Sequence, residues 1–336
     1  MPTVAVVILN YNGKNYLERF LAKVLKYSQP HAIYVADNAS TDDSIHFLQK
    51  YYPQITLITL PANTGYAGGY KEALKQIKAD YFVLLNSDVE VTENWIDPVI
   101  QVLEGNEKII ACQPKIKSYH QKSHFEYAGG AGGFIDFLGY PFCRGRIFST
   151  LEKDVGQYND TIEVFWATGA CLFLKADAYF ELGGLDPDFF AHMEEIDFCW
   201  RAKNQGYKVF YCAESTVYHV GGGTLEAENP FKTFLNFRNN LLMLYKNLSA
   251  VEFAAIYQKR QILDSLAALQ FFLTGKAKNA TAVYKAHTAF RGLKRNYSST
   301  EVPGLAHEQI YKNSLLKDYY MNGLKKFDQL KAAWKI

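Results

Sequence analysis

The sequence has few cysteines, and they form no recognisable motif. Five cysteines are scattered through 336 residues, without a single Cys-x-x-Cys pair. An odd number of cysteines among apolar neighbours does not fit a disulfide framework. We therefore expect buried free thiols and a reducing, cytoplasmic compartment.

Long apolar runs and an N-terminal leader are missing as well. No apolar run reaches the roughly 18 residues that a membrane-spanning helix requires. The chain passes from Met1-Pro2-Thr3 directly into a strand-like segment, which does not resemble a signal peptide. The mostly apolar run Ile262–Leu273 is long enough only for a core helix or for a helix that lies in a membrane interface.

Two common nucleotide-binding signatures are also missing. The chain has neither the G-x-G-x-x-G of dinucleotide-binding folds nor the G-K-[ST] of a P-loop, which argues against NAD-dependent enzymes and P-loop nucleotidases. Small residues instead fill Asn63-Thr64-Gly65-Tyr66-Ala67-Gly68-Gly69, just before an expected helix. Small residues let a backbone approach a ligand, and a helix N-terminus favours phosphate. Asn63 and Gly68 are therefore candidates for nucleotide binding.

The net charge of +2 hides an uneven distribution. Residues 232–336 carry 17 Lys and Arg against 6 Asp and Glu, a balance of +11, whereas residues 1–231 carry 19 against 28, a balance of −9. This asymmetry indicates that the C-terminal segment meets an anionic surface such as a membrane, although a solvated helical face would have a similar composition. Nucleic acid is not expected as a partner, because the basic stretch contains no recognisable reading motif.

Short apolar runs alternate with helical patterns in the first hundred residues. Expected strands cover Val4–Leu9, Ala32–Ala36, Ile55–Leu60 and Tyr81–Leu85, and expected helices cover Tyr16–Leu25, Ser44–Tyr51, Ala67–Ile77 and Trp95–Leu103. This alternation predicts an α/β fold with a mainly parallel central sheet flanked by helices. Later in the chain, expected strands cover Phe165–Lys175 and Lys208–Cys212, and an expected helix covers Glu194–Asn204.

The pattern changes near Asn229-Pro230. Long helical patterns rich in aromatic, Leu, Lys and Arg residues then cover Phe231–Leu248, Val251–Leu273 and Ala280–Lys294. We therefore expect an α/β domain over residues 1–228 and a C-terminal helical region over residues 229–336. The helical region could pack on the first domain, form a homodimer or lie on a membrane.

Polar side chains follow the fourth expected strand. Asn86-Ser87-Asp88 comes directly after the buried run that ends at Leu85. Ligands of open α/β sheets bind at the carboxyl ends of the strands, and a carboxylate there suits Mg²⁺ or Mn²⁺. An Asn-Ser-Asp turn without any ligand is the competing interpretation.

Three more candidates follow the first two strands. Asp37 ends the second strand, where its carboxylate could accept a hydrogen bond from the imide N–H of uracil or thymine. Asn10 and Tyr11 end the first strand beside it, and Tyr11 could flank a base. The competing interpretation is a cluster of turn and helix-capping residues.

Two further motifs come later in the chain. Trp166, Gly169 and Ala170 lie in a Trp-Ala-Thr-Gly-Ala segment that could form the floor of a sugar pocket, although ordinary strand packing has the same pattern. His219 follows a strand and precedes three glycines, a placement that suits a metal ligand but also a structural histidine.

Three carboxylates crowd one short segment. Glu194, Glu195 and Asp197 lie beside aromatic and apolar residues. Like charges this close raise at least one pKa, which favours a general base. On a helix, Glu194 and Asp197 share a face, so Glu195 points in a different direction. A helix start that is stabilised by acidic residues is the alternative.

Taken in order, these groups make the chain resemble the family 2 glycosyltransferases with the GT-A fold. It looks closest to the branch of bacterial rhamnosyl- and galactosyltransferases that act on lipid-linked or polysaccharide acceptors. The resemblance runs from Val4 to about Thr224 and rests on the order and spacing of the motifs.

The resemblance implies a role for each group. Asp37 would bind uracil or thymine, and Asn86-Ser87-Asp88 stands where the family has Asp-x-Asp, so that Asp88 would hold a divalent metal on the diphosphate. Asn86 departs from that pattern, which leaves its own role as a ligand in doubt. His219 would complete the metal shell, and Glu195 would be the general base, with Glu194 and Asp197 as the next candidates.

The implied reaction is the transfer of a sugar from a UDP- or dTDP-sugar to a hydroxyl of a glycan or lipid-linked acceptor, with inversion and with Mg²⁺ or Mn²⁺. The implied place is the cytoplasm, at the inner face of the membrane. A sugar nucleotidyltransferase and a non-catalytic carbohydrate-binding module remain as alternatives, although Leu9-Asn10-Tyr11-Asn12-Gly13-Lys14 offers little to grip a triphosphate.

Overall fold

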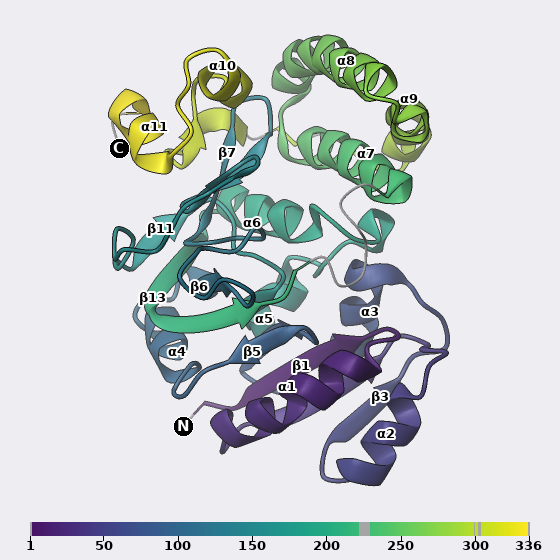
Figure 1. Ribbon diagram of the computed structural model, residues 1–336, viewed down its shortest axis with the longest axis vertical. Helices are drawn as coiled ribbons and strands as arrows, with labels where there is room; N and C mark the ends of the chain where they lie inside the picture. Colours follow the sequence, from purple (N-terminus) through teal and green to yellow (C-terminus); the bar gives the residue numbers. More distant parts are fainter. Residues whose placement is uncertain (1, 222–228, 299, 302–303, 335–336) are drawn as a thin grey trace.

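A computed structural model describes residues 2–221, 229–298, 300–301 and 304–334. It contains two sheets (Figure 1). The central one has nine strands in the order β11-β13-β6-β12-β4-β1-β2-β3, with β5 paired to β13. Its strands are β1 Val4–Asn10, β2 Ala32–Asp37, β3 Thr56–Thr59, β4 Tyr81–Asn86, β5 Val89–Val91, β6 Ile109–Ser118, β11 Ile162–Val164, β12 Cys171–Lys175 and β13 Lys208–His219.

A smaller sheet and two groups of helices complete the structure. The small sheet runs β10-β9-β8-β7-β14, with β7 Gly133–Asp136, β8 Pro141–Cys143, β9 Arg146–Ile147, β10 Thr150–Leu151 and β14 Ile310–Tyr311. The helices are α1 Lys14–Tyr27, α2 Ser44–Tyr51, α3 Gly65–Leu74, α4 Asp97–Glu104, α5 Ala176–Glu181, α6 Glu194–Asn204, α7 Pro230–Asn247, α8 Ala250–Leu273, α9 Ala277–Leu293, α10 Leu315–Tyr320 and α11 Phe327–Trp334. Short 3₁₀ turns cover Pro187–Phe189, Lys294–Asn296 and Gly304–Ala306.

The predicted α/β fold is confirmed. Strands β1, β2, β3 and β4 are parallel, and helices α1, α2 and α3 connect them in sequence. The register of β1 pairs Asn10 with Asp37 and Leu9 with Asn86. The polar residues that follow separate strands in the sequence therefore meet at one edge of the sheet, as the parallel pairing requires.

Antiparallel strands extend the sheet on the other side of β4. Strand β12 lies between β4 and β6 and runs against both of them. The short strand β5 pairs with the end of β13, where Val89 is opposite His219. Because Val89 directly follows Asp88, this pairing brings Asp88 next to His219 across a separation of 131 residues.

The structure differs from the predicted elements in several places. Strand β13 continues past the expected end at Cys212, through a register shift before Thr216, and His219 is its last residue rather than a residue that follows it. Only Cys171–Lys175 of the expected strand Phe165–Lys175 forms β12, because Thr168 Oγ1 accepts a hydrogen bond from the Ala170 N–H at 3.2 Å and turns the chain. Helix α4 begins at Asp97 rather than Trp95, and Pro98 occupies its first turn, where a missing N–H costs nothing. The small sheet was not predicted, because its strands of two to four residues leave no clear alternation.

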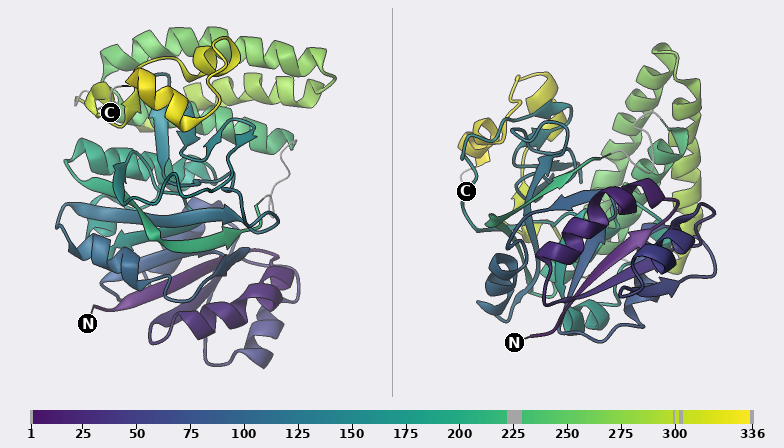
Figure 2. Two further views of the ribbon diagram at one scale, coloured as in Figure 1. Left: turned by 60° about the vertical axis from the view of Figure 1, so that its left-hand side comes forward. Right: turned by 60° about the horizontal axis from the view of Figure 1, so that its bottom comes forward.

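The C-terminal segment packs on the rest of the chain. Strand β14 pairs in parallel with β7, and the rings of Phe327 and Trp334 contact Phe134 at centroid distances of 5.1 and 5.4 Å. Figure 2 shows α7, α8 and α9 gathered at the end of the molecule opposite β3. Packing on the α/β part, one of the three arrangements considered for this segment, is therefore observed. The domain boundary at residue 228 stays a prediction.

All five cysteines are buried free thiols, as predicted. None of the helices that the structure describes is both long and apolar enough to cross a lipid bilayer.

Candidate active site

Three of the predicted nucleotide-binding residues, Asn10, Asp37 and Ser87, lie close together at the carboxyl edge of the sheet. Asn10 Nδ2 donates to Asp37 Oδ1 at 3.0 Å, and the second oxygen of Asp37 accepts from the Ser40 N–H at 2.8 Å. A Cβ atom at Gly13 would lie 2.4 Å from Asn10 Oδ1 and 3.3 Å from Ser87 Oγ, so only glycine fits between them. Asn10 Oδ1 is buried without a hydrogen-bond partner among the described residues, which leaves an acceptor for a ligand.

Asn63 and Gly68 shape the loop that precedes α3. Asn63 Oδ1 accepts from the Gly65 N–H at 2.9 Å and from Asn38 Nδ2 at 3.1 Å. A Cβ atom at Gly68 would lie 2.6 Å from Thr64 Cβ. These contacts fix the turn, and Asn38, which was not predicted, is the residue that ties this turn to the end of β2.

Asp88 and His219 form a buried pair, with Glu126 as an unpredicted third member. His219 Nε2 lies 3.1 Å from Asp88 Oδ1, and its Nδ1 lies 3.2 Å from Glu126 Oε2, in a geometry too bent for a well-formed hydrogen bond. All three residues are less than 9% exposed. Among the described residues, no three His, Cys, Asp or Glu side chains are arranged to hold a metal ion by themselves. Any ion here would therefore need ligands from substrate or water.

The charges of this group stabilise each other. Burial would lower the pKa of His219, but Asp88 and Glu126 outweigh it and raise the pKa to about 10. Burial also opposes ionisation of Asp88, yet His219 holds the pKa of that carboxyl below its usual value. Without a bound ion, the positive charge of the His219 imidazolium thus balances the carboxylates of Asp88 and Glu126. A metal that binds Nε2 must displace its proton.

Glu194 and Glu195 begin helix α6. Each has one oxygen, Oε2, that is buried and has no hydrogen-bond partner among the described residues. Burial raises the pKa of Glu194 well above its usual range, and the neighbouring Glu195 raises it further. Burial also raises the pKa of Glu195, to about 7, while backbone N–H groups, including that of Gly169, oppose this shift. Both shifts favour the protonated form, more strongly for Glu194 than for Glu195, so Glu195 is the better candidate to accept a proton near neutral pH.

Gly169 and Ala170 lie beside this pair. The Tyr66 hydroxyl donates to the Gly169 carbonyl at 2.6 Å, and the Asn86 N–H donates to the Ala170 carbonyl at 3.0 Å. The turn at these two residues thus connects the Asn86 segment with Glu195. Trp166 is separated from them, because its ring packs over Gly133 in the core and its Nε1 donates to the Phe134 carbonyl at 2.9 Å.

Asp197 is directed away from the other two carboxylates. It is fully buried, and its oxygens accept from Arg201, Lys246 and Asn247, each at 2.9 Å. Since Lys246 and Asn247 belong to α7, these bonds join α6 to the C-terminal segment. Of the three predicted carboxylates, only Glu194 and Glu195 keep an oxygen free for a substrate.

The loop before α6 has an unusual backbone. Phe190, His192 and Met193 have φ angles of 63, 72 and 73°, and each such angle costs a residue other than glycine on the order of 1–3 kcal/mol. Asn239 of α7 holds this loop, because its Nδ2 lies 2.7–2.9 Å from the carbonyl oxygens of Phe189, Ala191 and His192. The position of Glu194 and Glu195 thus depends on a helix from the other end of the chain.

We expect Asn239→Leu to lower the free energy of unfolding by about 2–4 kcal/mol, because three carbonyl groups lose a buried donor. The turnover number should fall with it, since the strained loop loses its support, while nucleotide affinity should change little. Asn236→Leu, on a half-exposed turn of the same helix, is the matched control for chemical unfolding and steady-state kinetics. Unchanged stability and turnover in Asn239→Leu would contradict this role.

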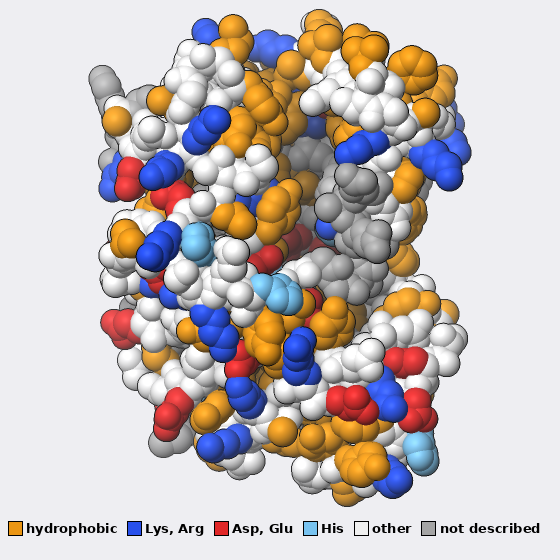
Figure 3. Space-filling view, viewed as in Figure 1, with side chains coloured by type: hydrophobic (Ala, Val, Ile, Leu, Met, Phe, Trp, Pro, Cys, Tyr) orange, Lys and Arg blue, Asp and Glu red, His pale blue; other side chains and the backbone are white. Residues whose placement is uncertain are grey.

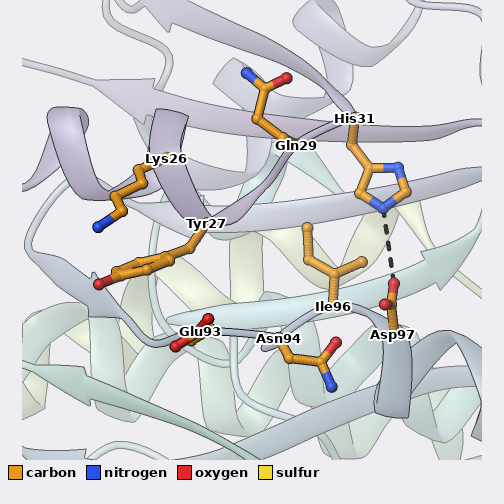
Figure 4. Close-up of a pocket in the computed structure, with 8 residues that line it drawn as sticks. All are labelled: Lys26, Tyr27, Gln29, His31, Glu93, Asn94, Ile96 and Asp97. Atoms are coloured by element: carbon orange, nitrogen blue, oxygen red, sulfur yellow. Dashed lines mark ion pairs between the residues drawn. The ribbon is translucent and has the colours of Figure 1, made fainter.

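These groups are separate from a hollow near the start of α4. Figure 4 shows that hollow, of about 300 Å³, between the end of α1 and residues 93–97, with His31 4.0 Å from Asp97. Its lining contains none of the predicted site residues. Figure 3 shows a different hollow in the middle of the face, with Asp and Glu side chains at its floor.

Comparison with known proteins identifies the family of the chain. The model of "Glycosyl transferase family 2" matches residues 5–179, which is more than half of the chain. The chain belongs to glycosyl transferase family 2. The protein is therefore a glycosyltransferase, and the alternatives of a nucleotidyltransferase and a carbohydrate-binding module are set aside.

Curated relatives of this transferase include a rhamnosyltransferase and a hexosyltransferase. An N-acetylglucosaminyl-diphospho-decaprenol L-rhamnosyltransferase of Mycobacterium tuberculosis is 26% identical over 65% of this chain and 75% of its own length. A low-salt glycan biosynthesis hexosyltransferase of Haloferax volcanii is 21% identical over 72% of this chain and 75% of its own.

Solved structures support the GT-A fold. A mannosyltransferase from Pyrobaculum calidifontis, in complex with GDP-Man and Mn²⁺, has a TM-score of 0.52 at 13% identity and covers 88% of this chain and 79% of its own. GalNAc-T7 with UDP, GalNAc and Mn²⁺ has a TM-score of 0.57 at 17% identity over 73% of this chain. The match spans about half of that second protein, 48% of its chain.

Proposed function

We propose that this transferase is an inverting enzyme that moves a sugar from a UDP- or dTDP-sugar to a hydroxyl group of a glycan or lipid-linked acceptor in cell-surface polysaccharide synthesis. The observation that carries the proposal is Glu195, a half-buried residue with one buried, unpartnered oxygen and a pKa raised to about 7. Such a group is suited to take a proton from an attacking hydroxyl near neutral pH.

A divalent ion, Mg²⁺ or Mn²⁺, fits Asp88 and His219. Adjacent ligands of an octahedral ion at about 2.1 Å are about 3.0 Å apart, and the distance between Asp88 Oδ1 and His219 Nε2 is 3.1 Å. Two protein ligands leave positions for diphosphate oxygens and water, the usual arrangement for Mg²⁺. When bound, the ion neutralises charge on the departing diphosphate. Asn86 contributes least, because its amide carries no charge.

The nucleotide occupies the edge formed by Asn10, Tyr11, Asp37 and Ser87. Tyr11 is 40% exposed, so its ring is free to cover a base. Asn10 Oδ1 offers the unpartnered acceptor, and the fully buried Asp37 holds Asn10 in place. Asp37 would also accept from the imide N–H of uracil or thymine. The turn at Gly169 and Ala170 forms the floor under the sugar, with Tyr66 beneath it.

The chain's own residues then carry out one displacement. The acceptor hydroxyl attacks the anomeric carbon from the face opposite the diphosphate, and Glu195 takes its proton as the new bond forms. The bond between the anomeric carbon and the diphosphate oxygen breaks in the same step, so the configuration inverts. Glu194 is less suited to act as the base, because burial and the neighbouring Glu195 raise its pKa well above the usual range and so favour its protonated form.

The relatives and the thiols support the proposed acceptor class and location. One relative is named for a diphospho-decaprenol acceptor, and five buried free thiols suit a reducing interior. A lipid-linked acceptor at the inner face of the cytoplasmic membrane satisfies both.

A panel of nucleotide sugars tests the proposal. With Mn²⁺ present, we expect a UDP- or dTDP-sugar to raise the melting temperature and to be hydrolysed slowly in the absence of acceptor. GDP- and CMP-sugars are the comparison set. If no nucleotide sugar shifts the melting temperature or releases its nucleotide, the proposed donor class is wrong.

A further inference from the structure

Helix α8 carries its apolar and charged residues on unexpected faces. The side that packs on the protein contains Phe253 and Ile256, but also the fully buried Arg260 and Asp264, whose side chains are 3.2 Å apart. The opposite side is exposed. A solvent-exposed helix face in a soluble protein is normally polar, so the outer face of α8 is the exception to explain.

Exposed apolar residues recur on this side of the helix, most densely between Ile262 and Leu273, with the polar Gln258 between Val251 and Ile262. Val251, Ile262, Leu266, Leu269 and Leu273 are between 52 and 81% exposed. Their spacings of three, four and eleven residues return to the same side of a helix with 3.6 residues per turn. Val251 and Leu273 are 22 positions apart in helix α8, so the stripe that these residues form extends over about 33 Å. Figure 3 shows hydrophobic side chains gathered at the top of the molecule, where α8 lies in Figure 1.

The surroundings of the stripe are basic. Residues 250–297, which the structure describes completely, contain eight Lys and Arg but only two acidic residues, Glu252 and Asp264. Asp264 is buried between Arg260 and His287, and Glu252 caps the helix through Ser249, so no acidic side chain in this stretch is exposed. Lys259, Lys278 and Lys285 are exposed on α8 and α9.

We propose that the outer face of α8, with its basic flanks, lies in the interface of an anionic lipid bilayer. An apolar stripe flanked by lysines is the surface that binds such an interface, since the stripe enters the acyl boundary and the lysines stay at the headgroups. A second copy of the chain is less suitable, because a symmetric contact would place basic flank against basic flank. The inference does not depend on the proposed reaction, because it concerns a surface remote from the site.

Sedimentation with vesicles tests this surface. We expect the full chain to bind vesicles of phosphatidylglycerol and phosphatidylcholine in equal amounts at low salt, to bind pure phosphatidylcholine weakly, and to be released by high salt. The triple variant Leu266→Gln, Leu269→Gln and Leu273→Gln should bind at least about tenfold more weakly, because three apolar side chains no longer enter the bilayer. The double variant Lys278→Glu and Lys285→Glu should weaken binding to the anionic vesicles and leave the weak binding to pure phosphatidylcholine unchanged.

A matched control separates the stripe from general surface apolarity. Tyr51→Gln, Val155→Gln and Met321→Gln removes three similarly exposed apolar side chains elsewhere and should leave vesicle binding unchanged. Absence of binding to anionic vesicles, or equal loss in the control, would overturn the proposal. A wild-type dimer that becomes monomeric in the leucine variant would also overturn it, in favour of a second copy.

Discussion

Replacing Glu195 by Gln should lower turnover by about 10²–10⁴-fold, the usual contribution of a general base, while the dissociation constant for the nucleotide stays within a few fold. The amide keeps the size of the side chain but cannot accept the proton. Glu194→Gln should be much milder, because burial and Glu195 raise the pKa of Glu194 and the amide resembles the protonated acid that this shift favours. Glu104→Gln, exposed on α4, is the control. The reverse order of effects would make Glu194 the base.

The pH profile provides a second measurement on the same residue. The pKa of Glu195 is raised to about 7, and only its ionised form can act as a base. The rate should therefore rise as pH increases through about 7 and level off above it. The residual activity of Glu195→Gln should lack this rise. An identical rise in wild type and variant would assign it to another group.

Replacing Asp88 by Asn should lower kcat/KM by about 10²–10³-fold and abolish the contribution of Mn²⁺ to nucleotide binding, since one anionic ligand is lost and His219 loses the charge that faces it. Calorimetry of Mn²⁺ and nucleotide, with and without chelator, measures this directly. Asp177→Asn, exposed on α5, is the control. Full activity of the wild type in excess chelator would contradict the prediction that Asp88 and His219 bind a catalytic metal ion.

The sequence predicted those parts of the site that follow from strand order. Asn10, Asp37 and Asn86 meet because parallel strands end at one edge, and alternating apolar runs reveal such strands. Glu126 and Asn239 could not be found in this way. Each reaches the site through long-range packing, Glu126 from an irregular loop and Asn239 from a helix nearly fifty residues beyond the loop that it holds.

A signal for Asn239 nevertheless exists in the sequence. Two adjacent asparagines, Asn239 and Asn240, stand in the middle of an aliphatic helix, where asparagine is unfavourable unless its side chain has a specific partner. The outer stripe of α8 was only partly predictable, because the sequence shows an apolar run but does not reveal which side of it is covered. Its exposed side is known only once Arg260 and Asp264 are seen to face inward.

The contact between Asn239 and the loop at residues 189–192 also sets an order of events during synthesis. When the first 221 residues have left the ribosome, Glu194 and Glu195 are present, but the helix that fixes their loop has not yet emerged. Strand β14 pairs with β7 across about 175 residues, so the small sheet also waits for the end of the chain. A nascent chain of 221 residues thus contains the nucleotide edge but lacks the helix that supports the loop before Glu194 and Glu195.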